Sequence, residues 1–307
     1  MKTFLLALFL VILLAAEAPA QCSAPQWDAT TGPSQLIQYV RYFSPTASAQ
    51  TVYGVYLPTA YTLEPERRFP VLYWAHGGGG DVSTGNTFVS MLHDAIGRGV
   101  VAPFIVVLLH GPQMVWTDSK PGGTPYNMPI ESVIINDLIP LIDSTYRTIA
   151  TRAGRGIEGF SMGGRGSARI GLKHHNKFSL VSILAGAFQN WTFFVLKDPS
   201  NADECVFGND EAYFNSTSPQ THANESAPAI VAGPSYQYRI VIGDADTGSG
   251  LKDNRGENIA FSNLLTSLGI NNALTIVPVC RHSYVCLYTN GGDPMFTFFH
   301  QWASGML

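Results

Sequence analysis

The chain carries little charge. Of its 307 residues, 13% are Asp, Glu, Lys or Arg, which is about half of the fraction usual in soluble domains. The formal net charge is −4, and the sequence shows no run of like charges and no internal repeat. A basic face of the kind that binds nucleic acid is therefore not expected, and we predict no nucleic-acid partner.

Long hydrophobic runs are also scarce, and the one at the start is short. The thirteen residues of Phe4–Ala16 are apolar, whereas a membrane-spanning helix needs about 20. Lys2 precedes this run, and the small-x-small sequence Ala18-Pro19-Ala20 follows it. This order is typical of a secretory signal peptide over residues 1–20, which leaves Gln21 as the first residue. We therefore predict a secreted, extracellular protein with no membrane contact after cleavage; a retained membrane anchor is the alternative.

Cysteine is infrequent too. The four cysteines, all beyond the predicted signal peptide, are Cys22, Cys205, Cys280 and Cys286. An even number of cysteines in an oxidising compartment predicts two disulfides, for which three connectivities exist. Because Cys280 and Cys286 are close in the sequence, we expect them to pair, which leaves Cys22 to pair with Cys205.

Apolar residues are plentiful, at 46%, and they accompany 30 Gly and 19 Pro. This composition suits one large globular domain. Continuous apolar runs predict buried parallel strands, and segments of helical spacing alternate with them. Strands are expected at residues 70–75, 104–109, 155–160, 180–184, 238–242 and 274–279, and helices at 88–96, 130–146 (with a kink at Pro140), 162–173, 257–268 and 294–302. The alternation predicts a single α/β domain over residues 21–307, with a mostly parallel sheet and helices on both faces.

Other segments depart from this alternation. Residues 38–43 and 52–57 partly alternate apolar and polar side chains, which predicts two antiparallel strands at an edge of the sheet. Residues 58–68 have the composition of a polar turn. Residues 187–236 are polar in patches and hold Cys205 and three N-glycosylation sequons, so we interpret them as a lid-like excursion with a glycosylated surface. The sequons begin at Asn190, Asn215 and Asn224.

Residues 159–164, Gly-Phe-Ser-Met-Gly-Gly, fit the pattern Gly-x-Ser-x-Gly. They join the predicted strand 155–160 to the predicted helix 162–173. In such a turn, the nucleophile elbow of serine hydrolases, the backbone holds the Ser161 hydroxyl above the end of the sheet, and glycines let strand and helix approach closely. A glycine-rich turn that merely contains a serine is the alternative. The chain must therefore also supply a base, an acid and an oxyanion hole.

The base should be a histidine, and in α/β hydrolases the chain order is nucleophile, acid, base. His282 directly follows the last predicted strand, where its side chain can reach over the strand ends. The other histidines suit this role less well. His174-His175 lies on the helix after the elbow, and His222 precedes the candidates for the acid. His300 lies among aromatic residues, where we expect it to pack.

The acid is expected at the end of the preceding strand. Residues 238–242 run into Gly243-Asp244-Ala245-Asp246. Asp246 fits the Gly-x-x-Asp spacing of this class of hydrolase, in which the glycine makes the turn and the carboxylate swings back toward the base. Asp244 is the alternative, and the carboxylate that is not the acid would be a turn or cap residue.

An oxyanion hole needs two backbone N–H groups. One is expected from Met162, the residue after the nucleophile. The other is expected from the loop His76–Gly80, whose glycines let the backbone turn its N–H groups toward a substrate. We choose Gly78 as this second donor and interpret His76 as a structural residue. A phosphate-binding loop is the alternative for this glycine run, but no Gly-Lys-Ser/Thr follows it. The chemistry needs no metal and no organic cofactor.

Together these segments resemble the esterase D and feruloyl esterase group of α/β hydrolases, the esterases of carbohydrate esterase family one. The segments that carry the resemblance span most of the chain after the signal: Val55–Pro58, Pro70–Asp81, Asp137–Pro140, Gly159–Gly164 and His282–Tyr284. The resemblance implies the α/β-hydrolase fold. It also implies a nucleophile, an acid and a base at Ser161, Asp246 and His282.

The resemblance further implies a serine carboxylic-ester hydrolase, and a secreted member implies plant cell-wall esters as substrates, such as feruloyl or acetyl groups on xylan. Trp116 and Tyr126, in the loop after strand 104–109, would stack on an aromatic acyl group or a sugar, or else pack that loop. Cys280-Arg281 replaces the glycine that many members have before the base, and the segment 187–236 is this chain's own. A secreted acyltransferase or serine peptidase would use the same triad, and a non-catalytic binding protein with this fold is the other alternative.

Overall fold

The computed structural model describes residues 22–29, 34–111, 115–197, 202–248 and 253–305, and the predicted signal peptide lies outside these ranges. Within them, eight strands form one sheet in the order β1-β2-β4-β3-β5-β6-β7-β8. The strands are β1 (Ile37–Ser44), β2 (Ala49–Tyr56), β3 (Val71–Ala75), β4 (Ile105–Leu108), β5 (Arg155–Phe160), β6 (Leu180–Leu184), β7 (Gln237–Gly243) and β8 (Asn272–Val277).

The sheet is mostly parallel. β1 and β2 form an antiparallel hairpin at one edge, and β2 pairs antiparallel with β4. Every neighbouring pair from β4 to β8 is parallel. The predicted parallel sheet and its antiparallel edge are therefore confirmed. Because parallel strands end at the same edge of a sheet, the loops after β3, β5, β6, β7 and β8 come together.

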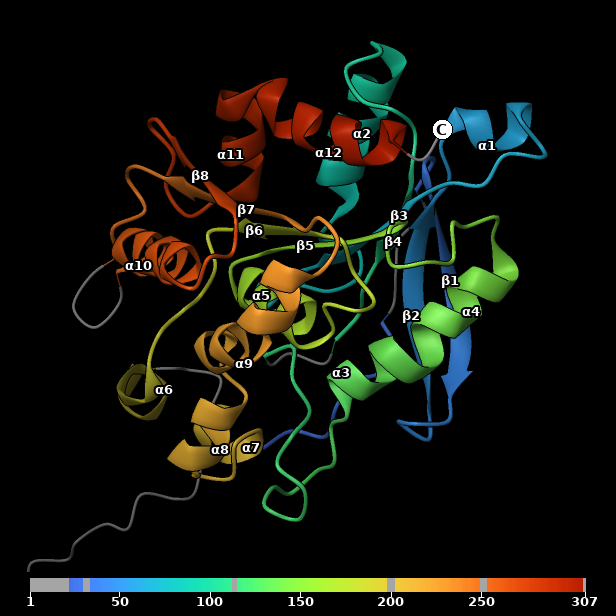
Figure 1. The fold of residues 1–307 in the computed structure, drawn as a ribbon. Coiled ribbons are helices and arrows are strands. Elements are labelled where there is room, and N and C mark those ends of the chain that lie inside the picture. Colours follow the sequence, from blue (N-terminus) through green and yellow to red (C-terminus); the bar gives the residue numbers. More distant parts are fainter. Residues whose placement is uncertain (1–21, 30–33, 112–114, 198–201, 249–252, 306–307) are drawn as a thin grey trace, which may run out of the picture.

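Helices cover both faces of this sheet (Figure 1). They are α1 (Thr59–Leu63), α2 (Asn86–Gly97), α3 (Ile130–Ser132), the π-helical η1 (Val133–Leu138), α4 (Ile139–Thr145), α5 (Met162–Lys173), α6 (Trp191–Lys197), α7 (Ala202–Cys205), α8 (Glu211–Ser216), α9 (Pro219–Ala232), α10 (Asn254–Ser267), α11 (Tyr284–Gly291) and α12 (Pro294–Ser304). α2, α11 and α12 contribute to the core on one face, and α4, α5, α9 and α10 contribute to the core on the other.

The central strands are buried on both of their faces. All residues of β3, β4 and β6 are buried, because successive side chains of a strand point to opposite faces and each face carries helices. In β3, Tyr73 joins the core that α5 covers, whereas Leu72 and Trp74 join the core that α2 covers. The continuous apolar runs in the sequence reflect this double burial.

Residues 130–146 differ from the kinked helix that the sequence predicts. They form α3, η1 and α4 in succession. Pro140 lies in the first turn of α4, where it lacks an N–H for the preceding turn and its ring crowds the carbonyl four residues before. The wider π-helical turn of η1 accommodates this crowding immediately before the proline.

Residues 187–236 are more helical than the predicted excursion. Their described part forms α6 to α9, and α9 packs beside α5. Ala223, Ala227 and Ile230 lie on the buried face of α9, where they form a narrow apolar stripe at helical spacing. The polar residues around them and Pro228 within the helix make this pattern hard to recognise in the sequence. This part of the segment belongs to the scaffold, not to a lid. The three sequon asparagines are exposed, and their glycosylation stays a prediction.

Two further short helices were not predicted, and the environment expected for one histidine was wrong. α1 lies within the predicted turn 58–68. α11 begins directly after Ser283, whose hydroxyl accepts the N–H of Cys286 at 3.3 Å and so caps the helix. His300 was expected to pack, but it is exposed on α12, because Phe299 and Trp302 occupy the buried face of that helix.

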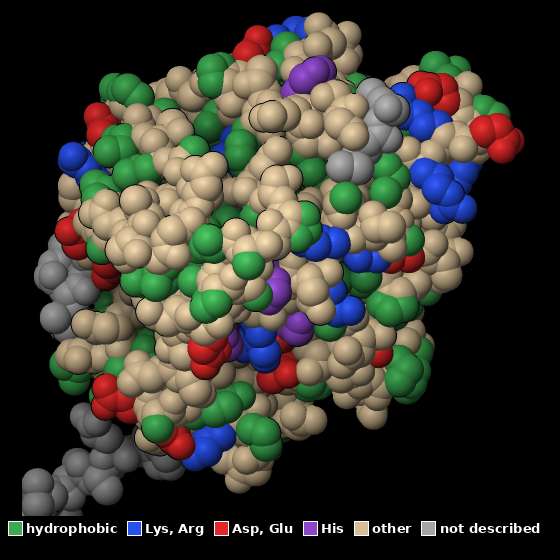
Figure 2. Space-filling view, in the orientation of Figure 1, with side chains coloured by type: hydrophobic (Ala, Val, Ile, Leu, Met, Phe, Trp, Pro, Cys, Tyr) green, Lys and Arg blue, Asp and Glu red, His purple; other side chains and the backbone are tan. Residues whose placement is uncertain are grey.

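The predicted disulfides, Cys22–Cys205 and Cys280–Cys286, are both present. Over the described ranges, we find no helix with the length and apolar character needed to cross a membrane. Figure 2 shows acidic and basic side chains scattered among uncharged ones over one face of the molecule, in keeping with the low charge of the sequence.

Candidate active site

Ser161 lies at a sharp turn between β5 and α5, and its backbone is strained. Its φ of 57° and ψ of −116° are unusual for a residue with a side chain. A Cβ at Gly163 would lie 2.1 Å from the carbonyl oxygen of Ala75, and one at Gly159 would lie 2.3 Å from that of Gly163. The glycines of the Gly-x-Ser-x-Gly pattern are therefore required for β3, β5 and α5 to meet. Leu184 fixes the turn, because its carbonyl accepts the Ser161 N–H at 2.8 Å.

His282 and Asp246 continue from this serine in a chain of hydrogen bonds. The Nε2 of His282 lies 2.8 Å from the Oγ of Ser161, and its Nδ1 lies 2.7 Å from the Oδ2 of Asp246. The carboxylate takes the Nδ1 hydrogen, which leaves Nε2 free to accept the serine proton. Asp246 is 4% exposed, so water competes little for this bond. Asp244 does not contact the imidazole; its carbonyl accepts a hydrogen bond from Arg255 at 3.2 Å.

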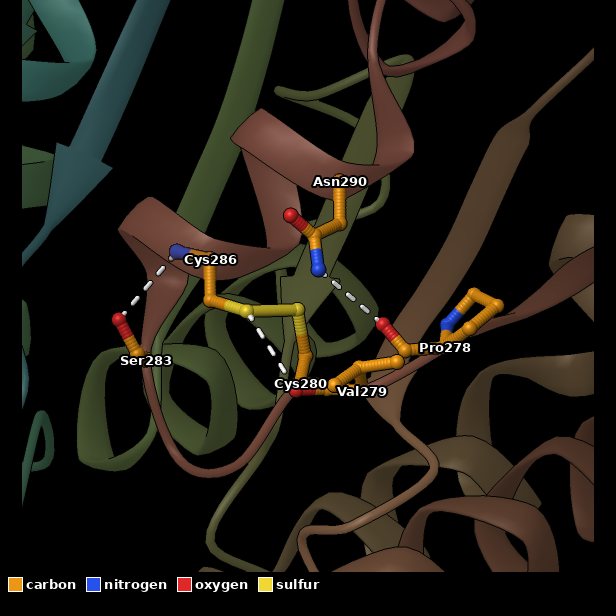
Figure 3. Close-up of a disulfide and its surroundings, with 6 residues drawn as sticks. All are labelled: Pro278, Val279, Cys280, Ser283, Cys286 and Asn290. Carbon is orange, nitrogen blue, oxygen red and sulfur yellow. Dashed lines mark hydrogen bonds between the residues drawn. A yellow bond between two sulfur atoms is a disulfide. The ribbon is translucent and has the colours of Figure 1, made fainter.

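A ring contact, a disulfide and a backbone hydrogen bond hold the loop that carries His282 in place. The ring of Phe160 packs against the imidazole with centroids 4.7 Å apart. The disulfide between Cys280 and Cys286, drawn in Figure 3, closes the short segment 280–286, and His282 belongs to this segment. The carbonyl of Cys280 also accepts the N–H of Ala245 at 3.1 Å, which ties the loop after β8 to the loop that holds Asp246.

We expect removal of this disulfide, in the double variant Cys280→Ser/Cys286→Ser, to lower kcat about tenfold or more, because small displacements of a catalytic group cost large factors in rate. Loss of this short closed loop should also lower the free energy of unfolding by about 2 kcal/mol. Ester hydrolysis rates and chemical denaturation measure the two effects.

The matched control is Cys22→Ser/Cys205→Ser, which removes a disulfide that joins the start of the described chain to α7. That pair closes a much longer loop, so its loss should destabilise the protein at least as strongly while kcat is retained. Equal kcat losses in the two double variants would mean that the Cys280–Cys286 bond acts through general stability alone.

The candidate oxyanion donors come from two segments that lie next to Ser161. Met162 is the first residue of α5, and N–H groups in the first turn of a helix have no acceptor within the helix. A Cβ at Gly77 would lie 3.3 Å from the Cβ of Ser161, so the glycine loop after β3 passes directly beside the serine. Gly78 is exposed, with nothing within 4 Å of the place of a Cβ. Its backbone therefore borders open space near Ser161.

The residues behind this glycine loop are structural. His76 is fully buried, and burial lowers its pKa to about 4, so it is neutral at pH 7. Its Nδ1 donates to the carbonyl of Gly77 at 2.9 Å. Trp116 was proposed above as a stacking residue, but it is 1% exposed, and its Nε1 donates to the carbonyl of His76 at 3.0 Å. Its ring therefore supports the glycine loop from inside and offers no face to a substrate. Tyr126 is 37% exposed, and its role stays a prediction.

The other histidines near α5 and α9 belong to a separate cluster. The Nε2 of His174 lies 2.7 Å from Oε1 of the buried Glu131, and Nδ1 of His222 lies 3.1 Å from Oε2 of Glu225. Burial and neighbouring cations lower the pKa of both imidazoles to about 4. Across the part of the chain that the structure describes, no three His, Cys, Asp or Glu side chains are arranged to hold a metal ion.

Sequence reasoning missed two residues at this site. Asn254, the first residue of α10, donates from Nδ2 to the Oδ1 of Asp246 at 2.8 Å. Gln189, in the loop after β6, donates to the Oδ1 of Asn254 at 2.8 Å. Neither belongs to a motif, and their meeting depends on how two distant loops fold together.

The sheet order, the strained serine after β5, and the Asp and His that follow β7 and β8 define the α/β-hydrolase class. Within this class, the family described as "Putative esterase" matches residues 44–266. This is more than half of the chain, and the chain therefore belongs to the "Putative esterase" family.

Curated relatives match part of the chain. An "Endo-1,4-beta-xylanase/feruloyl esterase" of Xylanibacter ruminicola is 33% identical over 159 residues, which is 49% of this chain and 21% of that protein. "Esterase Rv1288" of Mycobacterium tuberculosis is 34% identical over 136 residues, 43% of this chain and 28% of that protein. The aligned part thus spans less than a third of either relative.

Solved structures resemble the chain over most of its length. A "ferulic acid esterase" superposes with a TM-score of 0.70 at 18% identity, covering 87% of this chain and 97% of that one. An S-formylglutathione hydrolase from Staphylococcus aureus gives a TM-score of 0.67 at 16% identity, covering 86% and 98%. These likenesses confirm the predicted α/β-hydrolase fold.

Proposed function

We propose that the protein is a secreted serine carboxylic-ester hydrolase, with Ser161 as nucleophile, His282 as base and Asp246 as acid. The observation that carries this proposal is the hydrogen-bonded series Ser161–His282–Asp246, with distances of 2.8 and 2.7 Å, on a strained strand-to-helix turn. Membership of the "Putative esterase" family supports the same reaction.

The proposed reaction has two steps. Ser161 Oγ attacks the ester carbonyl while its proton passes to His282 Nε2, and Asp246 stabilises the imidazolium that forms. The N–H groups of Gly78 and Met162 stabilise the tetrahedral oxyanion. Collapse of this intermediate breaks the ester bond, and the imidazolium gives its proton to the leaving alcohol. Water, activated by the same imidazole, then cleaves the acyl-enzyme and releases the acid.

For the substrate, we propose plant cell-wall esters, such as feruloyl or acetyl groups on xylan. The ester would be either a small molecule or linked to the polysaccharide. The partial match to a xylanase/feruloyl esterase and the likeness to a ferulic acid esterase support this choice. The predicted signal peptide, the two disulfides and the three exposed sequon asparagines support an extracellular place of action. Tyr126 is the exposed aromatic residue that we propose for substrate contact.

The test is a panel of methyl hydroxycinnamates, acetylated xylan, short-chain nitrophenyl esters and peptides. We expect the highest kcat/KM on a hydroxycinnamate or on acetylated xylan. Cleavage of peptides in preference to all esters would identify a serine peptidase instead. Absence of turnover, together with failure of a fluorophosphonate to label Ser161, would favour a non-catalytic binding protein.

A further inference from the structure

The Asp246 carboxylate has a second partner besides His282. Its Oδ2 lies 2.7 Å from His282 Nδ1, and its Oδ1 accepts the Nδ2 of Asn254 at 2.8 Å. Asn254 is 1% exposed and opens α10, whose start is capped by Asp253. One oxygen of the carboxylate thus serves the imidazole while a buried amide on a rigid helix holds the other.

The amide of Asn254 has a defined orientation because it lies between the Asp246 carboxylate, which only accepts hydrogen bonds, and the donor of Gln189. Gln189, which is 3% exposed, donates from Nε2 to the Oδ1 of Asn254 at 2.8 Å. A flipped Asn254 would turn its oxygen toward the Asp246 carboxylate and its nitrogen toward the Gln189 nitrogen. Both contacts would be repulsive in a buried site, so the network selects the amide that donates to Asp246.

Asn254 acts on the carboxylate and not on the imidazole. Its Nδ2 also lies 3.1 Å from His282 Nδ1. However, Nδ1 has a single hydrogen-bonding position, and the carboxylate of Asp246 occupies it at the shorter distance of 2.7 Å. In the tautomer that can accept the Ser161 proton, Nδ1 carries a hydrogen and offers no acceptor to the amide.

Gln189 is itself anchored to α5, the helix that follows Ser161. Its carbonyl accepts the Nη1 of Arg165 at 3.1 Å, and the carbonyl of Ala187 accepts the same group at 3.3 Å. Arg165 is buried in the first turns of α5, and its guanidinium stacks over the ring of Phe214 at 4.9 Å. The loop after β6 is therefore fixed to the nucleophile helix at the point from which Gln189 reaches α10.

A second amide on α10 reinforces the same loop. Asn258 lies one turn after Asn254, accepts the N–H of Gly186 at 2.9 Å and donates to its carbonyl at 2.8 Å. The next residue, Ala187, donates its N–H to the carbonyl of Ser161 at 2.9 Å. One face of α10 thus contacts both the acid and the loop that binds the backbone of Ser161.

We propose that Asn254, oriented by Gln189, is a positioning residue that fixes the Asp246 carboxylate in the plane where it orients His282. The inference rests on the proposed function, since it assigns these amides to the triad of that reaction. Neither amide touches the reacting atoms. They act by restricting rotation of the Asp246 side chain, which would otherwise let the imidazole turn away from Ser161.

The test compares Asn254→Ala with the unchanged enzyme on 4-nitrophenyl acetate. We expect kcat and kcat/KM to fall together by about 10- to 100-fold, as for loss of a hydrogen bond to a charged group, while KM changes little. Gln189→Ala should lower kcat by about two- to tenfold. Because Gln189 acts through Asn254, the double variant should be no slower than Asn254→Ala.

Ser262→Ala is the matched control, because Ser262 is also a buried polar residue on α10 and loses a hydrogen bond, to Asn272 at 2.6 Å. It should keep its kcat. In an Asp246→Ala background, Asn254→Ala should cause no further loss, whereas a merely structural role would lower the rate again. Such a further loss, or an unchanged kcat in folded Asn254→Ala, would overturn the proposal.

Two further outcomes keep the test decisive. If circular dichroism shows that Asn254→Ala does not fold, Gln189→Ala carries the test, and an unchanged kcat in that variant overturns the proposal. Full activity of Ser161→Ala would instead contradict the proposed function itself. The two failures are thus distinguished by which variant keeps its rate.

Discussion

Replacing Ser161 with Ala should lower kcat on 4-nitrophenyl acetate by about 10⁴-fold or more, because the attacking oxygen is lost. The fold should survive. Ser161 already holds a Cβ at a φ of 57°, so alanine at the same backbone angles adds no strain. The side-chain bond that disappears is the 2.8 Å contact with His282. Initial rates, thermal melting and fluorophosphonate labelling together measure the result.

Ser144→Ala is the control for this substitution. Ser144 is exposed on α4, where its hydroxyl donates to the carbonyl of Leu141 at 2.9 Å, and its loss should leave both rate and labelling unchanged. Retention of most of the activity by Ser161→Ala, with an intact fold, would assign the nucleophile to another group. Loss of labelling in Ser161→Ala alone would identify the labelled residue.

Much of the fold is predictable because strands that are buried on both faces consist of nearly continuous apolar runs in the sequence. β6 (180–184) and α5 (162–173) have the predicted bounds. Prediction failed where apolar residues are few or a proline intervenes. α9 carries a narrow buried stripe around Pro228, and η1 replaces α-helical turns before Pro140. In both places tertiary packing overrides the local preference of the residues.

The order of the proposed triad along the chain was predictable, but the residues that surround it were not. Strand ends set the places of Ser161, Asp246 and His282, so a linear pattern contains them. Asn254 lies at the start of α10 and contacts Asp246. The packing of α10 against the loop after β6 depends on the tertiary structure, which local sequence patterns do not encode. The burial of Trp116 was not predictable either, because it depends on close packing against Gly166 in α5. A Cβ at Gly166 would lie 2.3 Å from the Cβ of Trp116.

Asp246→Asn should lower kcat by about 10³- to 10⁴-fold. The reason lies in the two partners of this side chain, His282 and Asn254. With its oxygen toward His282, the new amide would turn its NH₂ toward Nδ2 of Asn254, so that two donors face each other. With its NH₂ toward His282, it satisfies Asn254 but donates to Nδ1. The imidazole then carries its hydrogen on Nε2 and cannot accept the proton of Ser161. The rate of ester hydrolysis at neutral pH measures this loss.

Asp244→Asn is the matched control, since the two aspartates lie two residues apart in the loop after β7. The interaction that Asp244 makes with Arg255 uses its backbone carbonyl, which the substitution keeps. We therefore expect a change within about twofold, as for substitutions away from buried networks. A larger loss for Asp244→Asn than for Asp246→Asn would assign the acid to Asp244. Because the Asn254 donor favours the amide orientation that produces the wrong tautomer, Asn254→Ala should partly relieve the defect of Asp246→Asn.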